Sequence, residues 1–370
     1  MTTLLIENLT KRFKSETVLD DLTLEVASGE TLVIFGPSGA GKTILLRAIA
    51  GAVEPDHGRI VIGGVDVTNE PPERRGIGMA FQNFALFPHM TAFENIASPL
   101  LASKSARAKI QSGVEHVARL LKIDHVLTHT PRALSNGQKQ RTALARALAG
   151  APAVLLPEDP HRHVDAKLRF EMRLELPRLL ARQGSTVVYV TQDYKEAMAL
   201  GDRIAVLDRG QIAQFGSPED IYDSPANIEI ARLFGDPTIN LLDVMPEQDS
   251  VGVFVRISDQ RVPIDPGLSG AVGKPCVIGL RPETISFTTA SEGVPILIEA
   301  ETPFNEKTVT LAIKKRSREI LISRPSGAAG PIGGEARIMV RARDAMLFDK
   351  ETGLLIKSSD QVGGRAEAAA

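Results

Sequence analysis

The sequence predicts an α/β domain with a phosphate-binding loop, followed by a small all-β domain. Short β-rich runs alternate with helical patterns over the first two thirds of the chain, which is typical of a sheet covered by helices. A glycine-rich segment connects one of these strands to a helix. Beyond residue 245, short alternating runs are separated by Gly and Pro, as in a barrel or sandwich.

Hydrophobic periodicity predicts the elements of the first domain. A buried strand is expected at 31–35 and a helix at 42–51, where apolar residues recur at helical spacing up to Gly51. Residues 105–122 are expected to form an amphipathic helix. Its apolar face carries Ile110, Val114, Val117 and Leu121. Further strands are expected at 153–156, 185–191 and 203–208.

The second domain is expected at 236–356, because the character of the chain changes near DPTINLLDVM (236–245). The first domain would then span 1–235. The predicted strands of the second are VGVFVRI, PCVIGL, VPILIEA, TVTLAI, REILIS and ARIMVRA. Residues 357–370 are expected to form a disordered tail.

Composition excludes several classes of protein. The 370 residues carry a net charge of −2, which disfavours a broad nucleic-acid-binding face, so no nucleic-acid partner is expected. A single cysteine, Cys276, rules out an internal disulfide framework and is expected to be a buried small apolar residue. We expect neither a secretory signal nor a membrane span, so contact with a membrane would go through a partner.

The segment GPSGAGKT fits the pattern G-x-x-x-x-G-K-[ST] of a phosphate-binding loop. It comprises Gly36, Pro37, Ser38, Gly39, Ala40, Gly41, Lys42 and Thr43. Its glycines allow backbone N–H groups to surround phosphate oxygens at a helix N-terminus. Lys42 can reach the terminal phosphates of a nucleotide, and the Thr43 hydroxyl can bind Mg²⁺. The alternative is a glycine-rich turn that binds nothing, but the strand before it and the helix after it favour nucleotide binding.

Three further segments narrow the kind of nucleotide-binding protein. LSNGQKQRTALARAL (134–148) resembles the signature segment of ATP-binding-cassette (ABC) ATPases and its helix. FQNFALFPHMTAFENIA (81–97) resembles their Q-loop and helical region, and TQDYKEAMALGDRIAVLDRGQI (191–212) resembles their switch strand and closing region. The resemblance covers about 1–235 and implies a P-loop ABC ATPase domain with a helical subdomain at about 83–150.

The second domain also resembles a known module. IGLRPETISF (278–287) and MLFDKETG (346–353) resemble the accessory OB-like (TOBE-type) domain of the maltose-type, carbohydrate-uptake subfamily. This resemblance implies the energy-coupling ATPase subunit of a membrane importer for a sugar, polyol or similar solute. Its implied partners are two membrane-spanning permease subunits, a second cassette and, indirectly, an extracytoplasmic solute-binding protein. Its implied location is the cytoplasmic face of the inner membrane.

The resemblance also implies residue roles. Phe13 would stack on adenine, although an ordinary strand-end core residue is the alternative. Gln82 would contact Mg²⁺ and sense the membrane partner. The signature residues Ser135, Gly137 and Gln138 would contact the γ-phosphate across a cassette dimer. Asn136 replaces the first glycine of the usual LSGGQ, and asparagine tolerates left-handed backbone better than most residues.

The acidic residues of this site depart from the family pattern of Asp-Glu-Pro, in which a D-loop aspartate lies seven residues after the first acid. Counting back from Asp165 gives Glu158 in the place of the metal-orienting acid and Asp159 in the place of the catalytic base. An aspartate in the second place falls short by about one C–C bond, ~1.5 Å. A displacement near ~1 Å can cost on the order of 10²-fold in rate, so hydrolysis is expected to be weakened while nucleotide binding is kept.

A second departure points the same way. Gln192 follows Thr191, where the family has its switch histidine. A glutamine amide can hydrogen-bond the γ-phosphate but cannot carry the charge of a protonated imidazole. His161 and His163 raise the alternative of a zinc site, which two histidines without a nearby cysteine support poorly.

Four interpretations of function stay open. The chain is the hydrolytically weakened member of an unequal cassette pair, or it forms an active homodimer in which the exchanged acids compensate for each other. It is otherwise a regulator in which ATP only holds a dimer together, or a soluble ABC ATPase outside transport. The single cassette and the lack of a long basic or coiled insertion disfavour the last of these.

Overall fold

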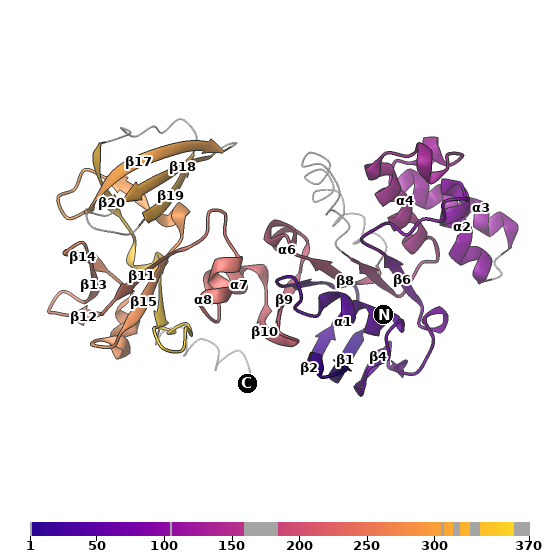
Figure 1. Ribbon diagram of the computed structural model, residues 1–370, viewed down its shortest axis with the longest axis horizontal. Coiled ribbons are helices and arrows are strands. Elements are labelled where there is room, and N and C mark those ends of the chain that lie inside the picture. The colour runs from indigo at the N-terminus through magenta and orange to yellow at the C-terminus, as the bar shows by residue number, and fades with distance from the viewer. Residues whose placement is uncertain are drawn as a thin grey trace. The chain divides into compact units, whose positions relative to one another are not determined.

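The computed structural model describes residues 2–103, 106–158, 184–304, 307–313, 319–325 and 334–358. The chain divides into two compact units, Met1–Pro218 and Glu219–Ala370, and each is described by itself. The elements are labelled in Figure 1.

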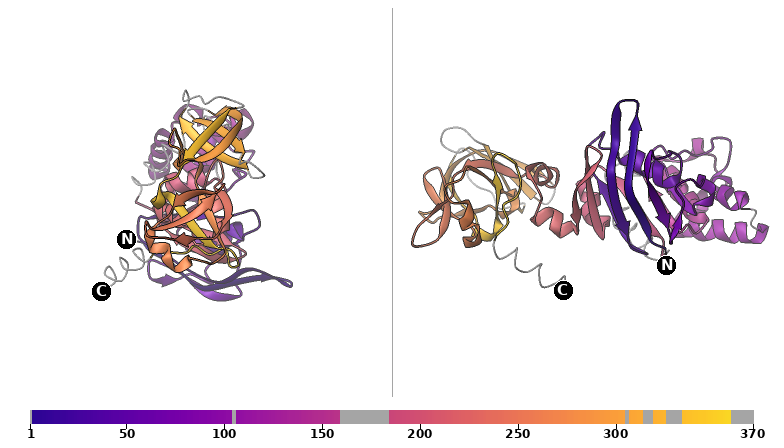
Figure 2. Two further views of the ribbon diagram at one scale, coloured as in Figure 1. Left: turned by 90° about the vertical axis from the view of Figure 1, so that its left-hand side faces the viewer. Right: turned by 90° about the horizontal axis from the view of Figure 1, so that it is seen from below.

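Two sheets build the first unit. The six-stranded sheet has the order β10-β9-β3-β8-β7-β6, in which β10 is antiparallel to β9 and the other neighbours are parallel. The four-stranded sheet is antiparallel and has the order β2-β1-β4-β5, and its long β1–β2 hairpin is seen in the right-hand view of Figure 2. The strands are β1 (Leu4–Phe13), β2 (Glu16–Val26), β3 (Thr31–Phe35), β4 (His57–Ile62), β5 (Val65–Asp66), β6 (Ile77–Ala80), β7 (Val154–Pro157), β8 (Thr186–Thr191), β9 (Arg203–Asp208) and β10 (Gln211–Gly216).

Helix α1 packs against both sheets, and its apolar side chains form one hydrophobic core with theirs. That core includes Leu4 and Ile6 of β1, Ile34 of β3, and Leu45 and Leu46 of α1, all fully buried. Helices α2, α3 and α4 gather apart from the antiparallel sheet (Figure 1). Among the described residues of this unit, the α-helices are α1 (Lys42–Ala50), α2 (Ala92–Ala102), α3 (Arg107–Leu120), α4 (Asn136–Ala149) and α6 (Tyr194–Leu200), and the short 3₁₀ turns are η1 (Pro72–Arg74), η2 (Asp124–Val126) and η3 (Pro131–Ala133).

The predicted elements of the first unit are confirmed. The strands expected at 31–35 and 203–208 are β3 and β9, and those expected at 153–156 and 185–191 are β7 and β8 within one residue at each end. Helix α1 ends at Ala50 because Gly51 adopts a left-handed conformation, with φ 79°, and its N–H bonds back to the last turn. The predicted apolar face of α3 and the residue after it is buried, at Ile110, Val114, Val117 and Leu121.

The second unit begins with two short helices, which were not predicted, and continues as the predicted β-structure. Three antiparallel sheets have the orders β11-β15-β21, β12-β13-β14 and β16-β20-β17-β18-β19. Their shared core includes Cys276, which is fully buried as expected. The elements are α7 (Pro218–Asp223), α8 (Ile228–Leu233), β11 (Asn240–Val244), β12 (Glu247–Gln248), β13 (Val253–Ile257), β14 (Gln260–Pro263), η4 (Pro266–Ala271), β15 (Cys276–Leu280), η5 (Pro282–Thr284), β16 (Ser286–Thr288), β17 (Val294–Phe304), β18 (Lys307–Ile313), β19 (Glu319–Pro325), β20 (Glu335–Met339), η6 (Ala342–Asp344) and β21 (Ala345–Asp349).

The two units divide before the predicted boundary at residues 235 and 236. Helices α7 and α8 associate with the β-structure, because Arg281 donates hydrogen bonds to the carbonyls of Tyr222 and Phe234. Ala231 of α8 also packs against Phe348 of β21. The predicted tail begins at Lys357, and its residues 359–370 lie outside the described residues.

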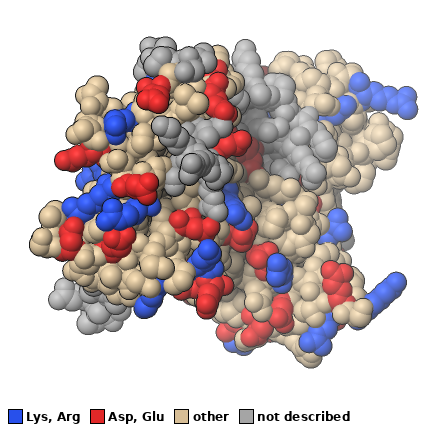
Figure 3. Space-filling view, turned by 60° about the vertical axis from the view of Figure 1, so that its left-hand side comes forward, with Lys and Arg blue, Asp and Glu red and all other residues tan. Residues whose placement is uncertain are grey.

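The surface carries both signs of charge. Lys and Arg side chains are interspersed with Asp and Glu over the face shown in Figure 3. Over the described ranges, no helix is both long and apolar enough to cross a membrane.

Candidate functional site

The phosphate-binding loop connects β3 to α1, and close backbone approach requires two of its glycines. A Cβ added at Gly36 would lie 2.1 Å from the carbonyl oxygen of Leu207 in β9, so only glycine fits there. Gly41 has φ +104°, and a Cβ on it would lie 2.8 Å from the Val18 carbonyl. The backbone of the loop therefore lies in close contact with β9 and β2, and the loop leads directly into the N-terminus of α1. Backbone N–H groups at a helix N-terminus can bind phosphate oxygens.

Lys42 is the first residue of α1 and its side chain turns back into the loop. Its Nζ donates hydrogen bonds to the carbonyls of Gly36 and Pro37, both at 2.7 Å, and only 6% of the residue is exposed. The ammonium group is therefore held within the loop, where a phosphate group would be surrounded by backbone N–H groups.

A cavity of about 350 Å³ lies beside the loop. Its loop side is lined by the predicted residues Ser38, Gly39, Gly41, Lys42 and Thr43. Its other side is lined by Gln82, Glu158 and Gln192, which are the predicted residues that follow β6, β7 and β8. Because these parallel strands are neighbours, their carboxyl ends meet at one edge of the sheet, which is where such folds place their ligands.

Glu158 stands at the centre of this edge. It is only 5% exposed, and its backbone N–H donates to the Ala80 carbonyl at 2.8 Å. It also pairs with Val190 in an isolated parallel bridge, two residues before Gln192. The carboxylate of Glu158, the Thr43 hydroxyl and the Gln82 amide therefore line one cavity, and all three offer the oxygen ligands that Mg²⁺ prefers.

The turn after Gln82 is fixed by a residue that the sequence did not indicate. Phe84 and Ala85 both have positive φ, 64° and 45°. Arg146 of α4 donates to the carbonyls of both, at 3.0 Å from Phe84 and 2.6 Å from Ala85. Burial lowers the pKa of the Arg146 guanidinium. The one sign in the sequence was that Arg146 interrupts the apolar helical run LARAL. Its hydrogen-bond partners lie about 60 residues away in sequence.

Gln192 is positioned by a buried acid that was also missed. Glu196 of α6 is 1% exposed and accepts hydrogen bonds from the Thr191 hydroxyl at 2.8 Å and the Tyr189 hydroxyl at 3.1 Å. The Thr191 hydroxyl in turn accepts from the N–H of Asp193 at 3.0 Å. This network holds both neighbours of Gln192, so the exposed amide of Gln192 stands at the cavity's edge on a fixed backbone.

The signature residues lie at the start of α4 and are absent from the cavity lining. Ser135 is the N-cap of α4, and its Oγ accepts from the Gln138 N–H at 3.3 Å. The Gln138 amide oxygen accepts from the Ser135 N–H at 2.9 Å, which completes a capping box, and Gly137 is buried. Asn136 is the first helical residue of α4 and has no positive φ, so the left-handed backbone considered for it is not used.

Phe13 lies outside the cavity lining. It ends β1 with 44% of its surface exposed, and the Lys11 ammonium lies 5.3 Å from its ring centroid. Val18 of β2 lines the cavity instead. The predicted base Asp159, the D-loop residue Asp165 and the histidines His161 and His163 all lie outside the described residues. Within the part that is described, no three His, Cys, Asp or Glu side chains gather to hold a metal ion.

Two family models match the chain. The model for the ABC transporter matches residues 19–162, and the model for the MalK OB fold domain matches residues 235–285. The first spans the phosphate-binding loop and the signature segment, and the second lies in the β-rich unit.

Two named relatives match most of the chain. It is 44% identical over 287 residues to the trehalose/maltose import ATP-binding protein MalK of Thermococcus litoralis, which covers 74% of this chain and 76% of that protein. It is 37% identical over 360 residues to the sn-glycerol-3-phosphate import ATP-binding protein UgpC of Yersinia pseudotuberculosis, covering 96% and 100%.

A solved structure resembles the first part of the chain. The dimeric cassette MJ0796 in a post-hydrolysis state bound to ADP and Pi aligns with a TM-score of 0.54 and 30% identity. The alignment covers 58% of this chain and 98% of that one. The similarity therefore places the fold of the loop, the sheet and α4 among nucleotide-binding cassettes.

Proposed function

The chain belongs to the ABC transporter family of import ATP-binding proteins, and from this premise we propose that it drives the uptake of a small sugar, polyol or related solute. It is the energy-coupling ATPase subunit of such an importer. The named relatives import trehalose or maltose and sn-glycerol 3-phosphate, which supports a hydroxyl-rich solute. The observation that carries the function is the cavity that joins the phosphate-binding loop to Gln82, Glu158 and Gln192.

The loop binds the phosphates of ATP. Its backbone N–H groups and the N-terminus of α1 face the phosphate oxygens, and Lys42 exchanges its hydrogen bonds to the Gly36 and Pro37 carbonyls for bonds to the terminal phosphates. Thr43, Gln82 and Glu158 supply oxygen ligands for Mg²⁺. The metal, when bound, neutralises charge on the phosphates.

Hydrolysis at this site is weakened relative to ordinary cassettes. Glu158 occupies the place of the metal-orienting acid, so the role of general base passes to the shorter Asp159. Help from a general base contributes typically ~10²–10⁴-fold, and a shortfall of ~1.5 Å removes much of it. Gln192 can donate a hydrogen bond to the γ-phosphate through its amide but supplies no positive charge.

A second cassette completes the site. Ser135, Gly137 and Gln138 are absent from the chain's own cavity, and in their capping box they fix the start of α4. Ser135 is exposed, so this segment can face a nucleotide held by a partner, and the related MJ0796 cassette is a dimer with bound ADP and Pi. We favour a partner cassette with intact acids, so that the pair is unequal. A homodimer is the competing arrangement.

As an importer subunit, the chain would lie at the inner face of the plasma membrane and bind two permease subunits. An extracytoplasmic solute-binding protein would deliver the solute to those subunits. Affinity purification of the tagged chain from detergent-solubilised membranes tests this. Two multi-spanning subunits should co-purify in stoichiometric amounts, and a Lys42→Ala variant should retain them. Recovery of the chain in a stable complex with ribosomes or DNA, without membrane subunits, would reject the proposal.

A further inference from the structure

A second cavity lies wholly within the β-rich unit, far along the chain from the nucleotide-binding residues. Its volume is about 350 Å³, within the range of small-molecule sites. One wall comes from the end of α7 and the residue after it, at Tyr222, Asp223 and Ser224. The others come from η4 with its N-cap Asp265, from η5, η6 and β21, and from the segment up to Ser358. Neither the predicted roles nor the nucleotide site uses these residues.

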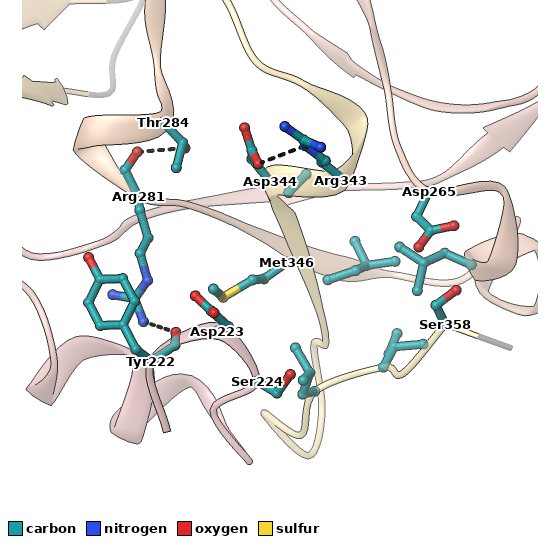
Figure 4. A pocket seen from close by; sticks show the side chains of 15 residues that line it. Tyr222, Asp223, Ser224, Asp265, Arg281, Thr284, Arg343, Asp344, Met346 and Ser358 are labelled. Carbon is teal, nitrogen blue, oxygen red and sulfur yellow. Dashed lines mark hydrogen bonds and ion pairs between the residues drawn. The ribbon is translucent and has the colours of Figure 1, made fainter. Parts of the chain in front are cut away.

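Two polar groups on opposite sides of this cavity have no hydrogen-bond partner among the described residues. They are Nε of Arg281, in a residue 3% exposed, and Oγ of Ser358, in a residue 4% exposed. In the view of Figure 4, Arg281 stands with Tyr222 at one side, and Ser358 stands with Asp265 at the other. Buried polar groups are nearly always satisfied, so this pair indicates that something else supplies the missing partners.

Arg281 is held rigidly at its side of the cavity. Its two terminal nitrogens donate to the Tyr222 and Phe234 carbonyls, and its guanidinium stacks 3.5 Å from the centroid of the Tyr222 ring. The Tyr222 hydroxyl is itself bonded to Glu283. Nε is the guanidinium nitrogen that makes no hydrogen bond to the described residues, and it is held in place because both terminal nitrogens are bonded.

The charges around the cavity select against an anion. Asp223, Asp265 and Asp344 face two guanidinium groups, those of Arg281 and Arg343, so the lining has an excess of negative charge. Asp344 is engaged with Arg341 at 2.6 Å, whereas Asp265 bonds the Gly267 N–H with one oxygen and can accept from a ligand with the other. A neutral ligand whose groups both donate and accept would satisfy a carboxylate, a serine hydroxyl and an arginine N–H together, and hydroxyl groups do both.

Apolar side chains complete the lining. Leu268, Met346 and Leu347 contribute to it, with Leu355 and Ile356 from the segment after β21. A sugar or polyol presents C–H faces between its hydroxyl groups, and these faces suit such a surface. We propose that this cavity binds one small uncharged polyhydroxylated molecule of about monosaccharide size, which bridges Arg281 and Ser358. Such a ligand would join α7, the first element of this unit, to the β-structure.

Titration of the full-length chain with D-glucose and with sorbitol tests the proposal, by calorimetry and by tyrosine fluorescence, because Tyr222 is one of three tyrosines and the chain has no tryptophan. At least one probe should bind saturably at one site, with a Kd on the order of 1 mM for a ligand of this size. Ser358→Ala should weaken binding roughly 3–10-fold through the loss of one hydrogen bond. Ser358→Leu should abolish it by filling the cavity.

Matched variants assign the binding to this cavity. Ser269→Ala, at an exposed serine outside the lining, should leave the affinity unchanged. Arg281→Lys should weaken binding of the same probe, and if that variant does not fold, the two Ser358 variants carry the test. Absence of saturable binding of both probes up to ~50 mM would overturn the proposal. So would binding that survives Ser358→Leu, or inorganic phosphate that binds more tightly than either polyol and loses affinity in the Ser358 variants.

Discussion

Glu158 and Val190 are paired in a parallel bridge, which sets the acidic end of β7 beside the strand that leads to Gln192. Two of the positions at which the chain departs from the usual cassette pattern, Glu158 and Gln192, are therefore at one edge of one sheet. Glu158 and Gln192 both line the cavity that the phosphate-binding loop also lines. We therefore expect the changes at these positions to act on one bound nucleotide, while the phosphate-binding loop keeps its full sequence pattern.

Replacement of Gly36 by alanine should destabilise the first unit, because the added Cβ would lie 2.1 Å from the Leu207 carbonyl. A backbone atom cannot move aside cheaply, so we expect a loss of roughly 1–3 kcal/mol in the free energy of unfolding and weaker ATP binding. Gly150→Ala is the matched control, since a Cβ there meets nothing within 4 Å and its φ is −79°. In urea unfolding, Gly150→Ala should show little change or a slight gain in the free energy of unfolding. An equal loss of stability in the two variants would contradict this explanation.

Lys42→Met should weaken ATP binding by roughly 10–100-fold, because it removes charge-assisted hydrogen bonds to the terminal phosphates. Equilibrium titration with a fluorescent ATP analogue measures this. Lys274→Met, at an exposed lysine of the second unit, should bind ATP as the unmodified chain does. If the affinity of Lys42→Met matches that control, Lys42 does not contact the nucleotide.

Arg146→Ala should loosen the turn that carries Gln82. Two hydrogen bonds to the Phe84 and Ala85 carbonyls would be lost, and for a partly exposed arginine this should cost about 1–3 kcal/mol of stability. We also expect a higher Mg²⁺ concentration for half-maximal ATP binding, because Gln82 would be less well positioned. Arg141→Ala on the same helix removes one bond, to the Leu121 carbonyl at 3.2 Å. It should leave the Mg²⁺ requirement unchanged, and a rise as large as that of Arg146→Ala would show that the effect is not specific to the turn.

The start of α2 should be sensitive to acid. Hydrogen bonds from the Thr91 backbone N–H and hydroxyl lower the pKa of Glu94 below its ordinary value of 4.5. A lowered pKa in the folded state means that this stabilisation is complete above about pH 4.5 and is lost as the pH falls through the folded-state value. Urea midpoints measured between about pH 3 and pH 7 should fall less steeply on the acid side for Glu94→Gln, whose amide oxygen still accepts the backbone bond without titrating. If Glu94→Gln and the unmodified chain show identical pH profiles, ionisation of Glu94 does not contribute to the acid sensitivity.

Periodicity predicted β3, β7, β8, β9, α1 and α3 of the first unit, but it did not predict the antiparallel sheet of β1, β2, β4 and β5. Strands β3 and β9 are continuous apolar runs because parallel strands in a covered sheet are buried on both faces, and that pattern is visible in the sequence. Of the eight residues in the predicted loop, five line the cavity, and Gly36, Pro37 and Ala40 do not.

Contacts between distant segments were not predictable in the same way. Arg146 reaches carbonyls about 60 residues away, and a carbonyl acceptor leaves no residue-specific mark in the sequence. In the sequence, Glu196 is an acidic residue of a helix with no visible partner. Its hydrogen bonds with the Tyr189 and Thr191 hydroxyls appear only in the folded structure. The compact units divide at Pro218, and Arg281 ties α7 and α8 to the β-structure, a contact that the change in composition near 236 does not reveal.

Single-turnover hydrolysis of ATP by the purified full-length chain tests the central claim most directly. The unmodified protein would be compared with one carrying Glu158→Asp, Asp159→Glu and Gln192→His, at matched ATP occupancy. We predict that the unmodified chain binds Mg-ATP but hydrolyses it slowly, and that the restored acids and histidine raise the rate on the order of 10²-fold or more with little change in affinity. A rate for the unmodified chain equal to that of the restored variant would contradict the claim that its site is weakened.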